Sequence, residues 1–124
     1  MNIRIFLTAV FLTLCMSLFC QAKLEIKDAK KNFGFVKKGE LVKINYEITN
    51  KGNEPLLITN IEISCSCTTA DFDKKPLLPG QTSTITINFD TKSVYDRQDR
   101  TVDVLSNDPK GPHKLRYKGV VLKK

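Results

Sequence analysis

A two-residue alternation of apolar and polar side chains between Leu41 and Thr49 limits the folds open to this chain more than any other feature. The apolar positions are Val42, Ile44, Tyr46 and Ile48. Side chains of a β-strand point to its two faces in turn, so the pattern predicts a strand with one face in a core and the other in water. No apolar repeat with the period of a helix continues past one turn in residues 23–124.

Short apolar stretches recur along the chain and are separated by residues that favour turns. Strands or strand pieces are expected at residues 24–26, 32–36, 41–49, 57–65, 70–72, 82–89, 102–104 and 114–122. Residues 74–80 contain two prolines and predict a loop, and the charged residues 90–100 predict a connection. About seven short strands, with a turn about every 8–12 residues, predict an all-β fold. The expected architecture is an immunoglobulin-like antiparallel β-sandwich, with a small closed barrel as the alternative.

The first 22 residues have the composition of a secretory signal peptide. Arg4 supplies a positive charge near the start, and Ile5–Phe19 is a largely apolar run. Cys20 and Ala22 are small residues at the two positions that signal peptidase reads, so cleavage after Ala22 is predicted. An N-terminal anchor that stays on the chain is the alternative. The run is too short and wrongly flanked for a membrane span, and the large Phe19 argues against lipoprotein processing at Cys20.

Cleavage would leave residues 23–124 as one small domain without a membrane span. We expect this domain to be exported to the periplasm, the cell surface or the medium. The whole chain has a formal net charge of +7 at pH 7. Its lysines occur as scattered pairs beside turn residues, and no basic stripe alternates with aromatic residues as in proteins that bind single strands. The charge therefore indicates a solvated surface, and no nucleic-acid partner is expected.

Cys65 and Cys67 are the candidate functional residues. On a continued strand they would lie on one face, but regular strand geometry separates residues two apart by about 6.6 Å between Cα atoms. A disulfide prefers about 5.5–6 Å, so a bridge would need a bend or bulge. As thiolates, the pair could hold Cu(I) or form half of a zinc site, with His113 or a second molecule supplying further ligands. The sequence is compatible with a disulfide, a metal site, a redox role or simple packing of these two cysteines.

Residues that would support catalysis are few. His113 is the only histidine and stands beside Pro112 at a predicted turn. The sequence has no nucleophile elbow, phosphate loop or calcium loop. We therefore do not expect an enzyme.

Several short motifs together resemble the DUF1573 family of exported bacterial proteins. They are Phe33-Gly34-Phe35-Val36, Gly39-Glu40, Asn50-Lys51-Gly52, Pro55-Leu56, Ser64-Cys65-Ser66-Cys67-Thr68, Leu78-Pro79-Gly80, Ile87-Asn88-Phe89-Asp90-Thr91, Val104-Leu105-Ser106-Asn107-Asp108-Pro109 and Gly119-Val120. The resemblance implies an immunoglobulin-like fold and an exported location, with no established reaction. Ser66 stands between the cysteines, where the family usually has glycine.

The leading functional hypothesis is a non-catalytic exported domain, a protein-interaction or structural module whose partner is another cell-envelope protein. The alternative is a thiol module that uses Cys65 and Cys67 to bind Cu(I) or zinc, or to exchange disulfides.

Overall fold

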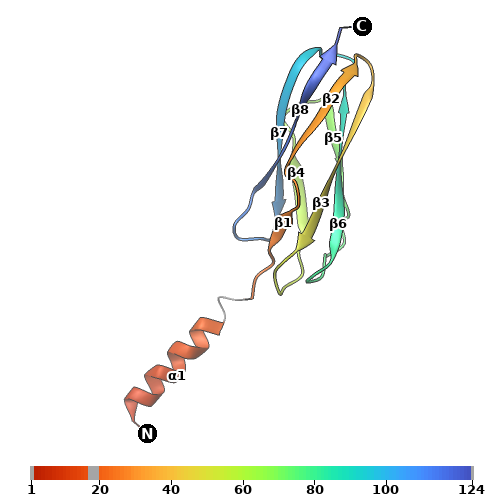
Figure 1. Ribbon diagram of the computed structural model, residues 1–124. Coiled ribbons are helices and arrows are strands. Elements are labelled where there is room, and N and C mark those ends of the chain that lie inside the picture. Colours follow the sequence, from red (N-terminus) through yellow and green to blue (C-terminus); the bar gives the residue numbers. More distant parts are fainter. Residues whose placement is uncertain (1, 17–19, 124) are drawn as a thin grey trace.

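The computed structural model describes residues 2–16 and 20–123. Its elements are α1 (Ile3–Met16), β1 (Leu24–Ile26), β2 (Lys30–Lys37), β3 (Leu41–Asn50), β4 (Ile58–Glu62), β5 (Thr68–Asp71), β6 (Thr82–Asp90), β7 (Asp96–Ser106) and β8 (His113–Leu122). The strands form one elongated body, and α1 lies outside it (Figure 1). No helix in the described ranges is both long and apolar enough to cross a membrane.

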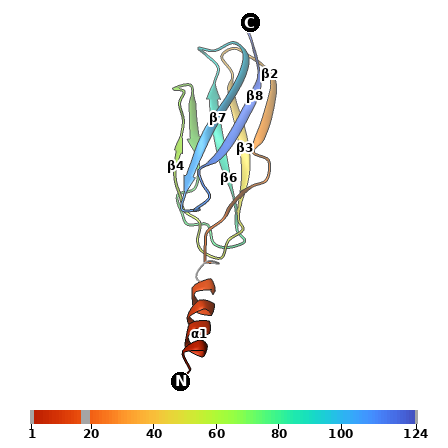
Figure 2. The same cartoon turned by 90° about the vertical axis from the view of Figure 1, so that its left-hand side faces the viewer.

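Two four-stranded sheets pack face to face. One has the order β1-β3-β6-β5 and the other β2-β8-β7-β4, and Figure 2 shows the second sheet turned toward the viewer. The prediction of an all-β, immunoglobulin-like sandwich is confirmed, with eight strands instead of about seven. One pairing differs from the antiparallel expectation, because β2 runs parallel to β8. The chain changes sheets between β1 and β2, so β2 joins the second sheet at its edge.

The prediction of a connection over residues 90–100 was wrong from Asp96 onward. β7 begins there and pairs with β8 from Asp96 opposite Val121. Gln98 is buried and Arg100 is half-buried, whereas the residues on either side of them are exposed. The strand is regular, but its inward positions at this end are polar. The sequence therefore lacks the apolar–polar alternation that would predict a strand here.

The expected strand over residues 57–65 is also shorter than predicted. β4 ends at Glu62, and its pairing with β7 shifts register between Ile58 and Asn60. The shift lets Ile58 and Ile61 both face the core, although they are three residues apart. Thr59, which lies between them, is exposed. The chain therefore leaves β4 before it reaches the cysteines.

The core is formed by the inward side chains of both sheets. Its largest fully buried members are Tyr46, Tyr117, Phe89, Ile48, Leu56, Ile85, Ile87 and Leu115. The Phe89 ring lies 5.7 Å from Phe33 and 5.4 Å from Tyr117, measured between centroids. The Tyr46 hydroxyl donates a hydrogen bond to the Arg116 carbonyl at 2.6 Å, which joins β3 of one sheet to β8 of the other.

The segment before β1 packs against the sandwich. The backbone amide of Asn53 donates to the Gln21 carbonyl at 3.0 Å, and the Gln21 amide donates to Asn53 Oδ1 at 2.9 Å. Ala22 is 4% exposed. A Cβ atom on Gly52 would collide with the carbonyl of Gln21. Glycine at position 52 therefore lets this segment approach, and the contacts include two residues that precede the predicted cleavage point.

Replacing Tyr46 by Phe removes the hydroxyl that joins the sheets and leaves the partly buried Arg116 carbonyl with one partner fewer. We expect the free energy of unfolding to fall by about 1–2 kcal/mol, measured by urea denaturation. Tyr95→Phe is the matched control, because the Tyr95 side chain is 52% exposed, and it should change stability by less than about 0.5 kcal/mol. Equal effects of the two substitutions would contradict the bridging role.

Alkaline pH should destabilise the fold through the buried tyrosines. Burial raises the pKa of both Tyr46 and Tyr117 above the ordinary value of 10.0. In the unfolded chain these hydroxyls ionise near their ordinary pKa, so the stability that they provide is complete below about pH 10 and declines above it. Urea titrations at rising pH should show this decline, and it should be smaller in Tyr46→Phe. A stability that stays level through pH 11 would contradict the expectation.

Candidate functional site

The two cysteines lie in a bend between β4 and β5. The structure joins Cys65 and Cys67 in a disulfide, with their Cα atoms 5.2 Å apart. This is shorter than the separation of about 6.6 Å in a regular strand. The amide of Thr68 donates to the Cys65 carbonyl at 3.2 Å and closes a turn, and the amide of Cys67 donates to Cys65 Sγ at 3.2 Å. Of the three arrangements left open by the sequence, the structure contains the bridged pair on a bent chain.

The bend does not need the glycine that the family usually carries between its cysteines. Among the described residues other than glycine, only Asp96 has a positive φ. Ser66 therefore occupies ordinary backbone space, where serine fits as well as glycine. Its side chain is exposed, whereas Cys65 and Cys67 are both half-buried. The two cysteines thus lie partly at the surface of the protein.

A hydroxyl pair lies beneath the disulfide and connects the two sheets. Thr68 Oγ1 is 2.7 Å from the Tyr117 hydroxyl and 3.7 Å from Cys67 Sγ. Thr68 and Tyr117 are 5% and 1% exposed, so their hydrogen bond is shielded from water. Burial raises the pKa of Tyr117, while the bond from Thr68 and the positive charge of Arg100 oppose that rise. The sulfur of Cys67 therefore contacts a buried polar group as well as the core.

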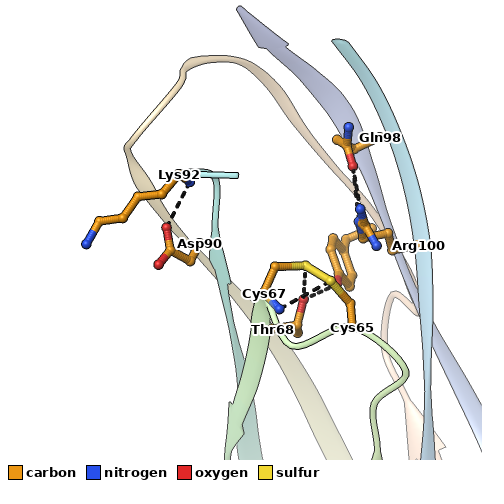
Figure 3. Close-up of a disulfide and its surroundings, with 8 residues drawn as sticks. Cys65, Cys67, Thr68, Asp90, Lys92, Gln98 and Arg100 are labelled. Atoms are coloured by element: carbon orange, nitrogen blue, oxygen red, sulfur yellow. Dashed lines mark hydrogen bonds between the residues drawn. A yellow bond between two sulfur atoms is a disulfide. The ribbon is translucent and has the colours of Figure 1, made fainter. Parts of the chain in front are cut away.

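Arg100 points inward from β7 beside this group. Its Nε and Nη2 atoms donate to Gln98 Oε1 at 3.1 and 2.9 Å, and its Cζ lies 5.5 Å from the centroid of the Phe89 ring. Gln98 in turn donates to the Tyr95 carbonyl at 2.9 Å. Figure 3 shows the Arg100 side chain on the same side of the strands as the disulfide. The site thus combines a disulfide, a buried hydroxyl pair and a guanidinium group.

The guanidinium of Arg100 differs from that of Arg116 in its partner. Arg116, on the outer face of β8, forms a two-pronged ion pair with Asp99. In the part of the chain that the structure describes, Arg100 forms no salt bridge, and its partner is the neutral amide of Gln98. Burying an unpaired charge is unfavourable, and Arg100 keeps part of its surface in solvent.

Sequence reasoning missed Arg100 and Tyr117 as members of this site. Both are inward residues of strands, and Arg100 stands opposite Tyr117 in the pairing of β7 with β8. The sequence did contain an indication of this: Gln98 and Arg100 continue the two-residue spacing of Val102 and Val104. All four positions share one face of a strand.

His113, considered as a further metal ligand, lies elsewhere. It stands opposite Val104 in the strand pairing, and its Nε2 is 3.5 Å from Asp108 Oδ2. Asp108 is 6% exposed and also accepts a hydrogen bond from the Leu24 amide at 2.8 Å. Within residues 2–16 and 20–123, no group of three or more His, Cys, Asp or Glu side chains is placed to hold a metal ion. Asp108 therefore links His113 to the first residue of β1.

Removing the disulfide should cost little stability. Cys65 and Cys67 are two residues apart, and so short a loop restricts the unfolded chain only weakly. In the double variant Cys65→Ser/Cys67→Ser, we expect the free energy of unfolding to fall by about 1–2 kcal/mol, measured by urea denaturation. Ser66→Ala serves as the control in the same bend. Loss of the folded state in the double variant would show instead that the bridge is needed for folding.

Comparisons with known proteins agree with this architecture. Residues 24–121 match the family described as "Protein of unknown function (DUF1573)". No curated protein matches the chain. A protein of unknown function from Porphyromonas gingivalis W83 is similar in structure over 82% of this chain, with a TM-score of 0.73 and 22% sequence identity. This chain spans 48% of that protein, about half of its length.

Two further solved structures have the same kind of sandwich. The ASH / PapD-like domain 7 of human CEP192 is similar over 84% of this chain and 88% of its own, with a TM-score of 0.64 and 14% identity. The YadV chaperone is similar over 82% of this chain and 52% of its own, with a TM-score of 0.51 and 19% identity. At these identities the likeness shows the fold alone. Because the family match extends over residues 24–121, the chain belongs to the DUF1573 family, whose function is undefined.

Proposed function

We propose that the protein is an exported, non-catalytic domain of the cell envelope that binds an extended segment of another envelope protein along the edge of β6. The apolar N-terminal run supports export. The observation that carries the binding role is a stretch of β6 that lacks a neighbouring strand on one side. An open strand edge binds other chains through its backbone groups, without a catalytic residue.

The open stretch results from the difference in length between β5 and β6. β3 pairs with β6 along its whole length, whereas β5 pairs only with residues 86–89 of β6. No strand in the described parts of the chain pairs with residues 82–85 on the β5 side. Beyond Asp71 the chain leaves the sheet and forms a bridge between Leu77 and Leu56.

The direction of the free backbone groups follows from two hydrogen bonds. The amide of Asp90 donates to the Cys67 carbonyl on the β5 side, at 2.7 Å. The carbonyl of Gln81 accepts from the Asn50 amide on the β3 side, at 3.1 Å. Since these directions alternate along an antiparallel strand, the N–H and C=O groups of Thr82 and Thr84 face the open side.

A hollow of about 340 Å³ borders this edge. Polar residues of the β6 end line it together with apolar ones: Gln81, Thr82, Ser83 and Thr84, with Ile48, Leu56, Ile58, Phe72, Pro76, Leu77 and Ile85. Alternate side chains of an added strand point toward the space between the sheets, so the hollow would receive one side chain of the partner. Asp73 and Lys75, which carry opposite charges and are exposed, also line the hollow.

The edge of β2 offers a contrast. β2 is also an edge strand, and it carries Lys30, Lys31 and Lys37. Lysines on an edge strand discourage pairing with other chains. The open stretch of β6 reads Thr-Ser-Thr-Ile and has no charged side chain. The composition of the two edges therefore favours β6 as the edge that accepts a partner strand.

Proline at position 84 should block strand addition without breaking the sheet. It removes the amide that faces the open side, whereas Ser83 and Ile85 keep their pairing with β3. A photo-crosslinking amino acid at position 82 should capture one envelope protein through an extended segment. We expect Thr84→Pro to reduce that capture by at least about tenfold, since the central backbone bond is lost. Thr84→Val keeps the amide and should retain capture.

Circular dichroism and urea denaturation of both variants show whether the sandwich is intact. Equal capture by folded Thr84→Pro and Thr84→Val would overturn the proposed edge. Capture of a second copy of this chain, in place of another envelope protein, would also contradict the proposed partner.

A further inference from the structure

We infer that the Cys65–Cys67 disulfide is a thiol–disulfide exchange site and that Arg100 stabilises its reduced form. The substrate class is a dithiol, either on a protein or as a small molecule. This site is separate from the open edge of β6, so the inference does not depend on the proposed docking of a partner strand.

The position of the bridge allows exchange within the folded protein. Cys65 and Cys67 are half-buried and Ser66 between them is exposed, so a thiolate can approach from solvent. The bridge encloses only one residue and holds no distant parts of the chain together. The strands on either side are held by their own pairing with β6 and β7. Opening the bridge therefore leaves the sandwich in place.

The charge distribution around the bridge favours reduction. A disulfide is neutral and gains little from a nearby positive charge, whereas a thiolate is stabilised by one. Arg100 supplies that charge and forms no salt bridge among the described residues. The carboxylate of Asp90, which the close-up also draws, accepts a hydrogen bond from the Lys92 amide at 3.0 Å and points away from the sulfurs (Figure 3). Reduction would thus give Arg100 the anionic neighbour that the oxidised site lacks.

The hydroxyl pair extends this effect to Cys67. Either oxygen of the Thr68–Tyr117 bond can be the donor, so Tyr117 can donate to Thr68 while Thr68 turns its own hydrogen toward Cys67 Sγ. The charge of Arg100 acts on the Tyr117 hydroxyl at the other end of the same pair. A thiolate at Cys67 could therefore accept a hydrogen bond from the Thr68 hydroxyl. Thr68 in turn is bonded to Tyr117, on which the positive charge of Arg100 acts.

The exchange balances without any further reagent. A thiolate of the dithiol attacks one sulfur of the bridge, which breaks the Cys65–Cys67 bond and releases the other cysteine as a thiolate. The second thiol of the dithiol then displaces the protein from the mixed disulfide. The dithiol loses two electrons and two protons and becomes a disulfide. The cysteines gain the two electrons, and the protons go to the cysteine sulfurs, or to solvent where a thiolate persists.

Equilibration with reduced and oxidised dithiothreitol tests the role of Arg100. The fraction of reduced protein is read by alkylation and intact mass, and circular dichroism confirms that each sample is folded. For Arg100→Met, we expect half-reduction to need about a tenfold higher ratio of reduced to oxidised reagent than in the wild type, because the substitution removes a positive charge that favours the thiolate.

Two further variants separate charge from packing. Arg100→Lys keeps the charge and should stay within about threefold of the wild type. Arg97→Met removes an exposed cation from the outer face of the same strand and should leave the equilibrium unchanged. Equal equilibria for Arg100→Met and the wild type would overturn the role of Arg100. A bridge that is reduced only when the wild-type protein unfolds would overturn the exchange site itself.

Discussion

The hydrogen bond between Tyr117 and Thr68 links the two sheets at the point where the cysteine bend ends and β5 begins. Tyr117 belongs to β8 and is 1% exposed, and its hydroxyl lies 2.7 Å from Thr68 Oγ1 at the start of β5. The contact joins the two sheets and fixes the position at which β5 begins. The cysteine bend lies directly before that position. Since β5 contains only four residues, it ends beside Thr86 and leaves the first part of β6 without a neighbouring strand on that side.

Backbone pairing between strands and packing of inward side chains stabilise the fold. The site lies where the inward side chains change from apolar to polar. Over most of the sandwich the inward positions are aliphatic or aromatic. Around the disulfide they include Thr68, Gln98 and Arg100. Polar groups at such positions need partners, and each of these three has a hydrogen bond. Arg100 differs from the other two because it is charged and its hydrogen bonds go to the neutral amide of Gln98, not to a carboxylate. Arg100 therefore has no carboxylate partner among the described residues.

The sequence predicts the strands whose inward residues are apolar and fails where they are polar. The run from Leu41 to Thr49 corresponds to β3 within one residue, because its alternation is complete. The start of β7 was missed because Gln98 and Arg100 occupy its inward positions. The parallel pairing of β2 with β8 has no signal in either strand alone, since it depends on where the chain changes sheets. The cysteines were identified from their spacing, but the position of Arg100 opposite Tyr117 follows only from the register of β7 against β8.

Residue-resolved amide hydrogen exchange on the oxidised and reduced protein tests the central claim, a stable sandwich with an open β6 edge and a separately reducible bridge. The account predicts fast exchange at Thr84 and slow exchange at Ser83 and Ile85, because the first amide faces the open side and the other two face β3. It also predicts that reduction changes exchange only around the cysteine bend and its neighbours in β7 and β8. Slow exchange at all three β6 amides, or a loss of protection throughout the strands on reduction, would contradict it.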